Sequence, residues 1–360
     1  MTGPLAGVRI VELGGLGPAP FAAMMLADNG ADVVRVNRIG ETIPRGDALQ
    51  RSRMVVNLNL KDASDRSALL ELIGSADAMV EGFRPGTIER LGIGPEMLLH
   101  HNPSLVIGRM TGWGQDGPYA RFAGHDINYI GLSGALHASG PADRPIAPPA
   151  MLGDFGGGGM MLAFSVTAAI LHARQTGVGQ VIDCAMVDGS ALLMAPFYSM
   201  YANGEWKDRR SANFTDGGAH FYRAYQTSDD LFIAIGSIEP PFYALLLERL
   251  GLSADPDYAR QLDDVLWPEL TAKLAAIFRT RTRQQWCELL EYSDVCFAPV
   301  LSIAEAPHHP HAVARNAFVE IDGIIQPAPA PRYSATPLDA PRTARIVTAD
   351  ELVVTAAVDD

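Results

Sequence analysis

The first 36 residues carry a pattern that is typical of a βαβ unit. Residues 7–13 are short, β-branched and apolar, which predicts a buried strand. A glycine-rich turn leads into an apolar helix over 19–28, and Pro18 suits its first turn. A second β-branched strand follows at 31–36. The sequence therefore predicts an α/β fold with a Rossmann-like, doubly wound parallel sheet.

The turn of this unit departs from the fingerprint of dinucleotide-binding proteins. Gly15 and Gly17 are present, but Pro20 stands where the third glycine belongs. The acid that would bind an NAD ribose after the second strand is also missing, and Asn37 and Arg38 take its place. A guanidinium there suits a ribose phosphate, as in NADP or the 3′-phosphate of coenzyme A. The unit thus predicts the fold but not NAD binding.

Further strands are predicted at 78–81, 104–110 and 179–186. The intervening helices are predicted at 63–74, 87–91, 95–101 and 160–174. Residues 82–86 and 111–118 follow strand ends, where open α/β sheets bind ligands. We expect Asp154 and the glycines at 156–159 to open the helix at 160–174. Its first N–H groups would then face an anion, and the glycines would allow a close approach.

The chain is long enough for two domains. The predicted large domain comprises 1–186 plus 313–360, and 187–219 is predicted to be a linker. Residues 220–312 form a smaller α+β domain, with a hairpin at 221–226 and 231–236. Its predicted helices are 241–250, 266–278 and 282–291, the last with a capping box between Thr282 and Gln285. The proline-rich tail is expected to cover the surface.

Net charge is −13, which disfavours general nucleic-acid binding. Between Arg35 and Lys61, however, six Lys or Arg face two Asp or Glu, a local +4 that predicts a patch for an anionic ligand. No signal-peptide pattern is visible, and the longest apolar run, 160–171, is too short to span a bilayer. These features predict a cytoplasmic enzyme that does not act at a membrane.

Metal binding is not expected. The three cysteines lack metal or redox spacing. His308, His309 and His311 have no acid or cysteine at ligand spacing, so an exposed linker is the better interpretation.

Three segments contain candidate catalytic residues. His125 and Asp126 lie side by side, close to the hydroxyl of Tyr129. Asp154 and Glu239 are further carboxylates in small-residue or proline-rich surroundings. For any one of these residues, a structural hydrogen bond is the simpler explanation.

Taken together, these segments resemble the family III CoA-transferase superfamily, and within it the α-methylacyl-CoA racemase branch. The matching segments are 7–36, 81–86, 111–114, 124–129, 153–156 and 238–240. The resemblance implies a racemase that inverts the 2-methyl centre of acyl-CoA thioesters without a cofactor. It also implies an interlocked homodimer, each active site drawing on the large domain of one chain and the small domain of the other.

The resemblance assigns roles to individual residues. It implies that His125 and Asp154 are the two acid/base groups and that Glu239 is the partner of His125. The residues implied to hold coenzyme A are Arg38, Leu58, Asn59, Leu60, Lys61, Gly82, Phe83, Arg84, Arg90, Gly124, Asp126, Ile127, Asn128 and Tyr129.

Residue chemistry agrees with two acid/base groups. Inversion beside a thioester carbonyl removes a proton from one face of the carbon and delivers one to the other through a planar enolate, so two positioned groups are needed. The ordinary pKa values of His and Asp differ by about 2.6 units, or roughly 3.5 kcal/mol. Burial would narrow this gap. A helix N-terminus beside Asp154 would widen it, so desolvation has to dominate. Backbone N–H groups near Asp126 or in the glycine run would hold the enolate oxygen.

Three other functions stay open. A CoA-transferase would use Asp126 as a nucleophile that forms an acyl anhydride. In that branch the preceding residue is typically aromatic, whereas here it is His125. The first βαβ unit alone favours an NADP-dependent reductase. A non-catalytic acyl-CoA carrier would not need His125.

Overall fold

A computed structural model describes residues 2–348 and 351, which form two compact units. The first unit comprises residues 1–133, 148–194 and 311–360, and the second comprises 134–147 and 195–310. The stretch 187–219, predicted as a linker, contains helix α8 (Met186–Leu193) in the first unit and α9 (Ala195–Ala202) in the second. Alanine, leucine and methionine favour helix, which explains why this stretch is not extended.

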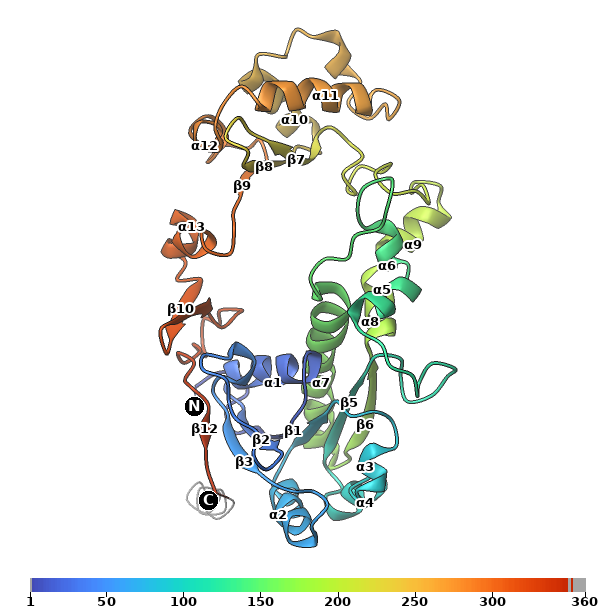
Figure 1. The fold of residues 1–360 in the computed structure, drawn as a ribbon, viewed down its shortest axis with the longest axis vertical. Coiled ribbons are helices and arrows are strands. Elements are labelled where there is room, and N and C mark those ends of the chain that lie inside the picture. Colours follow the sequence, from blue (N-terminus) through green and yellow to red (C-terminus); the bar gives the residue numbers. More distant parts are fainter. Residues whose placement is uncertain (1, 349–350, 352–360) are drawn as a thin grey trace. The chain divides into compact units, whose positions relative to one another are not determined.

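The first unit is built on a seven-stranded parallel sheet, as predicted (Figure 1). The strand order is β12-β3-β2-β1-β4-β5-β6. The strands are β1 (Arg9–Leu13), β2 (Asp32–Asn37), β3 (Met54–Asn57), β4 (Ala78–Glu81), β5 (Val106–Thr111), β6 (Gln180–Ala185) and β12 (Arg345–Ile346). Apart from the added β12, this is the Rossmann order, which reverses direction between β1 and β4. The sequence did not predict β3 or β12.

Helices cover both faces of this sheet (Figure 1). The helices of this unit are α1 (Pro18–Asp28), α2 (Ala63–Gly74), α3 (Thr87–Arg90), α4 (Pro95–His101), α5 (Asp126–Leu132), η2 (Met151–Met160), α7 (Met161–Thr176), α8 and short η1 (Ala48–Gln50). The short helix α13 (Pro310–Ala314) lies away from the sheet (Figure 1). Side chains alternate between two cores: Ile10 joins the core under α1 and α7, and Val11 joins the core under α2 and α4. Both faces are therefore buried, as a doubly wound sheet requires.

One helix is longer than predicted. A π-helix, η2, runs directly into α7, so the helical segment extends over Met151–Thr176. Its 26 residues are long and apolar enough to cross a membrane by length and composition, contrary to the prediction from the shorter run 160–171. However, Leu162, Val166 and Ile170 pack into the core against the sheet.

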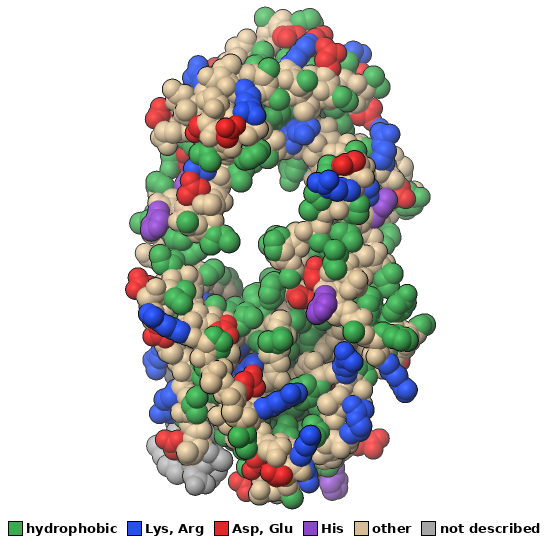
Figure 2. Space-filling model, viewed as in Figure 1, with side chains coloured by type: hydrophobic (Ala, Val, Ile, Leu, Met, Phe, Trp, Pro, Cys, Tyr) green, Lys and Arg blue, Asp and Glu red, His purple; other side chains and the backbone are tan. Residues whose placement is uncertain are grey.

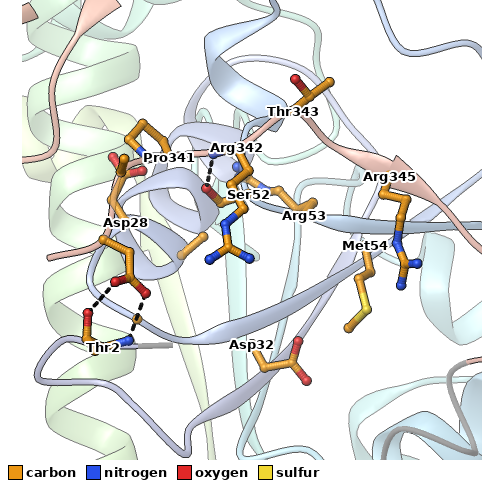
Figure 3. Close-up of a pocket in the computed structure, with 14 residues that line it drawn as sticks. Thr2, Asp28, Asp32, Ser52, Arg53, Met54, Pro341, Arg342, Thr343 and Arg345 are labelled. Atoms are coloured by element: carbon orange, nitrogen blue, oxygen red, sulfur yellow. Dashed lines mark hydrogen bonds between the residues drawn. The ribbon is translucent and has the colours of Figure 1, made fainter. Parts of the chain in front are cut away.

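The C-terminal segment packs along the first unit. A hairpin of β10 (Phe318–Ile321) and β11 (Ile324–Pro327) precedes β12, which pairs in parallel with β3. Figure 3 shows this segment beside β3, where the N–H of Arg342 donates to Ser52 Oγ at 3.1 Å. In return, the N–H of Ser52 donates to the carbonyl of Arg342 at 2.7 Å.

The second unit has its own core around a three-stranded antiparallel sheet, β7-β8-β9. Its elements are α6 (Ala135–Ala138), α9, β7 (Tyr222–Gln226), β8 (Phe232–Gly236), α10 (Pro240–Leu250), η3 (Pro256–Ala259), α11 (Trp267–Phe278), α12 (Arg283–Leu290), β9 (Phe297–Val300) and η4 (Ala306–His308). The predicted hairpin, the three predicted helices and the Thr282–Gln285 capping box are all confirmed.

Candidate active site

A cavity of about 650 Å³ lies at the carboxyl ends of β1, β2 and β3. Leu13, Asn37 and Leu58 border it at or directly after those strand ends. We call it the Arg38 cavity. The two charged side chains in its lining, Arg38 and Lys61, are cations, so it suits an anionic ligand.

Six residues predicted to hold coenzyme A line this cavity. They are Arg38, Leu58, Asn59, Leu60, Lys61 and Phe83. Residues from β2, from the segment after β3 and from the loop after β4 are brought together here, although about 45 residues separate the first from the last in the chain. Their place at this edge follows from the parallel topology.

A smaller cavity, of about 260 Å³, lies at the carboxyl ends of β4, β5 and β6. Gly82, Thr111 and Met186 border it at those strand ends. We call it the His125 cavity because His125 is in its lining. Phe83 lines both cavities. The two cavities thus lie on either side of the point where the strand order reverses, which is where open α/β sheets bind ligands.

The predicted positive patch is smaller than the residue count implied. Arg35 and Arg53 are buried and both pair with Glu12, Arg53 through Nε at 3.0 Å. Arg51 is buried against Asp28, with Nε to Oδ1 at 3.0 Å. Both acids lie outside the counted window, so the local +4 was wrong as a measure of surface charge. Figure 2 shows Lys and Arg interspersed with Asp and Glu over the visible face.

His125 lies at the start of a helix that the sequence did not predict. It is the exposed N-cap residue of α5, and its N–H donates to the side-chain oxygen of Asn128 at 3.0 Å. The hydroxyl of buried Tyr129 donates to the carbonyl of Gly124. A Cβ at Gly112 would lie only 2.2 Å from the Tyr129 ring, so glycine is needed there. These contacts fix the backbone that presents His125.

Asp154 is held next to this helix by a carboxylate. Asp126, the first residue of α5, is buried, and its Oδ1 accepts the N–H of Gly153 at 2.7 Å and of Asp154 at 2.9 Å. Asp154 lies in the first turn of η2 rather than ahead of the helix, so the prediction that residues 154–159 open a helix at 160 was wrong. The anion at the helix start is the side chain of Asp126.

The electrostatic surroundings favour protonation of Asp154. Burial, and next the negative charge of Asp126, raise the pKa of the Asp154 carboxyl above its ordinary value, and the charge of His125 partly offsets this. The direction of this shift is the one expected when desolvation dominates.

The start of α1 also adjoins Asp154. A Cβ on Gly17 would lie 3.6 Å from Asp154 Oδ2. Leu16 and Pro18, the neighbours of Gly17, line the His125 cavity, whereas Gly17 and Asp154 are not part of its lining. Helix α1 begins with Pro-Ala-Pro, and two of these three residues have no N–H to stabilise an ionised carboxylate.

The glycine run serves packing rather than ligand binding. A Cβ on Gly157 would lie 2.5 Å from the backbone nitrogen of Ser190, and one on Gly189 would lie 1.8 Å from the carbonyl oxygen of Gly157. A Cβ on Gly159 would lie 2.6 Å from the Phe21 ring. Helices η2, α8 and α1 can approach this closely only because these residues have no side chain. This contact also explains why a helix tolerates four consecutive glycines.

The remaining predicted residues divide into two groups. Gly82, Arg84, Gly124 and Tyr129 line the His125 cavity along with Phe83. Arg90, Ile127 and Asn128 are exposed and line neither cavity, and Arg90 donates to Thr87 Oγ1 at 3.0 Å. A role for these three in binding stays a prediction.

Glu239 lies in the second unit. It is the exposed N-cap residue of α10. Burial, and next the charge of Glu239, raise the pKa of the Cys296 thiol. Its partnership with His125 stays a prediction.

Two features of the site were missed. The role of Asp126 in holding Asp154 has no signal in the sequence, because the two residues are 28 positions apart and meet only in the tertiary fold. The pairing of buried Glu81, the last residue of β4, with Arg109 of β5 was also overlooked. A charged residue within an otherwise apolar strand is the signal that could have found both.

A third cavity is a weaker candidate. It has about 370 Å³ and lies where β2, β3 and β12 begin, at the edge opposite the other two (Figure 3). Asp28, Asp32 and Arg53 in its lining are each paired with another side chain. Within residues 2–348 and 351, no group of three or more His, Cys, Asp or Glu is arranged to hold a metal ion, and His309 Nε2 lies 3.0 Å from Glu291 Oε1.

Comparison with known proteins identifies the family. Residues 5–345 match CoA-transferase family III. The chain belongs to CoA-transferase family III. Among family members, the α-methylacyl-CoA racemase of Mus musculus is 44% identical over 336 residues, covering 92% of this chain and 87% of the relative. The α-methylacyl-CoA racemase of Homo sapiens is 42% identical over 337 residues, with the same coverage of both chains.

A solved structure has the same fold. A CaiB/BaiF family protein from Brucella suis superposes with a TM-score of 0.82 at 23% identity, covering 100% of both chains. The family III match spans both units and includes His125, Asp154 and Glu239.

Proposed function

We propose that the protein is a racemase that interconverts the (2R) and (2S) forms of 2-methylacyl-CoA thioesters by moving a proton through an enolate. Two relatives that are 44% and 42% identical over 92% of the chain carry the name of this activity. The arrangement of the His125 cavity supports the same chemistry.

The observation that carries the proposal is the hydrogen bonding of the Asp126 carboxylate. By accepting the N–H groups of Gly153 and Asp154, it fixes the start of η2 against the start of α5. His125, the residue before Asp126, lines the His125 cavity, and in this proposal the carboxyl of Asp154 acts in the same cavity from the start of η2. The raised pKa of Asp154 brings this acid closer to the range of an imidazole, as reversible proton transfer between both faces requires.

The proposed reaction uses each group in turn. Neutral His125 removes the proton from C2 of one enantiomer, and protonated Asp154 delivers a proton to the opposite face. The other enantiomer reacts with ionised Asp154 and protonated His125. In the first turn of α5 the N–H of Asn128 donates to the carbonyl of His125 at 2.8 Å, so the N–H groups of Asp126 and Ile127 are the ones proposed to hold the enolate oxygen. The chemistry requires no cofactor.

In this proposal, coenzyme A is the part of the substrate that the protein binds without changing it. The Arg38 cavity has two cations in its lining and adjoins the His125 cavity at Phe83. We place the nucleotide in the Arg38 cavity and the thioester in the His125 cavity.

The proposal includes a cytoplasmic homodimer in which Glu239 of one chain pairs with His125 of the other. Phe164 and Leu171 of α7 and Leu192 of α8 are 72%, 61% and 59% exposed. Large apolar side chains on this scale are typical of surfaces that a partner covers.

The alternative is a family III CoA-transferase with Asp126 as the nucleophile. Its carboxylate is buried, and one of its oxygens already accepts two backbone N–H groups. A nucleophile needs a free lone pair facing the acyl carbon, so this environment favours a holding role over attack.

Incubation of a single enantiomer of a 2-methylacyl-CoA in D₂O tests the proposal. A racemase incorporates deuterium at C2 and removes the optical activity without any acceptor acid. Strict dependence on an acceptor acid, with C2 unlabelled, would establish the transferase instead.

A further inference from the structure

A buried charge network joins β4, β5 and α3. Glu81 is fully buried at the end of β4, and its Oε1 accepts Arg109 Nε at 2.8 Å. Its Oε2 accepts the N–H of Phe83 at 2.6 Å. Arg109 lies directly opposite on β5, and its guanidinium also contacts Glu89 of α3 at 2.9 Å.

The network encloses the loop that separates the two cavities. Residues 82–86 connect β4 to α3, so Glu81 holds this loop at its start and Glu89 lies just beyond its end. Gly82, Arg84 and Pro85 line the His125 cavity, and Phe83 lines both cavities. Glu81 and Arg109 line neither. Their effect on a ligand would therefore be transmitted through the loop.

Stability alone is a weak explanation for this network. The free energy that a buried ion pair loses by desolvation is barely offset by the attraction between its charges. Apolar side chains of similar volume in the same place often give a protein that is equally stable. A planar guanidinium bound to two carboxylates instead holds these groups in a fixed geometry. Here that geometry fixes the backbone N–H of Phe83, next to the ring that adjoins both cavities.

We propose that Glu81 and Arg109 are positioning residues that hold the 82–86 loop, so that binding of the nucleotide in the Arg38 cavity places the thioester at His125. This inference rests on the proposed racemase function. Binding energy from a part of the substrate that does not react can be used for orientation at the reacting carbon only if the connection between them is rigid. The 82–86 loop lies between the two cavities, so a substrate that occupies both cavities must pass along it.

The test compares two substrates. One is a 2-methylacyl-CoA, and the other is the same acyl group on N-acetylcysteamine, which lacks the nucleotide. The readout is kcat/KM for exchange at C2 in D₂O, expressed as the ratio of the value for the full substrate to that for the truncated substrate.

The variants are Glu81→Gln, which can satisfy only one of its two partners, and Arg109→Lys, which cannot contact both carboxylates. Asp28→Asn is the matched control, because Asp28 is a buried partner of Arg51 away from both cavities.

We expect the ratio to fall by about ten-fold or more in Glu81→Gln, less in Arg109→Lys, and not in Asp28→Asn. A variant that merely folds less well loses activity on both substrates equally and leaves the ratio unchanged. An unchanged ratio in both network variants, or an equal fall in Asp28→Asn, would overturn the proposal.

Amide exchange of the 82–86 loop provides a readout that does not require catalysis. The loop should exchange faster in Glu81→Gln than in the wild type with coenzyme A bound, and equal rates would overturn the positioning role. If the wild type exchanges C2 on neither substrate, the racemase function has failed, and this second measurement still decides whether the network holds the loop.

Discussion

The carboxylate of Asp126 accepts the backbone N–H of Asp154 at 2.9 Å. Asp126 therefore affects Asp154 in two ways. The hydrogen bond fixes the backbone of Asp154 in place. Burial raises the pKa of the Asp154 carboxyl, and the negative charge of Asp126 raises it further. Asp126, the residue beside His125, thus positions Asp154, the second acid/base group of the proposed racemase, and raises its pKa.

Replacing Asp126 by Asn separates these two effects. Asn keeps an oxygen for the two N–H groups but removes the charge, so the pKa of Asp154 should fall. For the enantiomer that ionised Asp154 deprotonates, the acid limb of the pH–rate profile should then move to lower pH, while the alkaline limb stays. Activity at the optimum should remain within about ten-fold of the wild type, a factor typical of altered acid/base matching. An unmoved acid limb would contradict the tuning role, and complete loss of activity would favour Asp126 as a nucleophile.

Arg38 should contribute mainly to binding of the ribose phosphate. We expect Arg38→Ala to weaken coenzyme A by roughly ten-fold or more, as for loss of a charge-assisted hydrogen bond, and dephospho-coenzyme A much less. Calorimetric titration with both ligands measures this. Arg315→Ala is the comparison, because Arg315 is exposed, lines neither cavity and is not among the residues predicted to hold coenzyme A. Equal losses for both ligands in Arg38→Ala would place the 3′-phosphate elsewhere.

His220 should make the second unit sensitive to acid. It is fully buried, with Nε2 at 2.8 Å from the Tyr243 hydroxyl, and burial lowers its pKa to about 4. The unfolded chain binds this proton below about pH 6.5, whereas the folded chain does not until about pH 4, so stability is lost as the pH falls between these values. The loss is at most roughly 3 kcal/mol.

His220→Gln cannot take up this proton. Its unfolding temperature should therefore fall less steeply between pH 6.5 and 4 than that of the wild type, as measured by scanning calorimetry. The exposed His308→Gln is the control and should leave the slope unchanged. Equal slopes for His220→Gln and the wild type would show that His220 does not carry this dependence.

Sharing of sites between chains can be tested by complementation. His125→Ala and Glu239→Ala should each be nearly inactive alone. After joint refolding, roughly a quarter of the wild-type activity should return, since about half of the dimers are mixed and each has one intact site. No recovery in demonstrably mixed dimers would mean that both residues act within one chain.

Most of the first sheet was predictable because its signals are local. The strand at Arg9–Leu13, the turn and the helix at Pro18–Asp28 follow from β-branched runs, glycine and proline, which act over a few residues. Strand β3 was missed because Arg51, Arg53 and Asn57 flank its apolar residues and hide the pattern. Those arginines are buried by pairing with Glu12 and Asp28, which are distant in sequence.

The site was less predictable than the sheet. His125, Asp154 and Leu58 to Lys61 were identified by resemblance, whereas Arg38 and residues 82–86 were also indicated by their position after predicted strands. The helix through four glycines, the hydrogen bonds of Asp126 and the network at Glu81 depend on contacts between distant segments. Intrinsic propensity opposes a helix through Gly156–Gly159, and only packing against Gly189 and Phe21 reverses it.

The most direct test asks which enantiomer each variant can still deprotonate. In D₂O, His125→Ala should exchange the C2 proton of one enantiomer only, through Asp154, and Asp154→Ala should exchange that of the opposite enantiomer only, through His125. Neither variant should racemise its substrate at more than a small fraction of the wild-type rate. Exchange of the same enantiomer by both variants, or racemisation by either at the wild-type rate, would contradict the assignment of His125 and Asp154 to opposite faces.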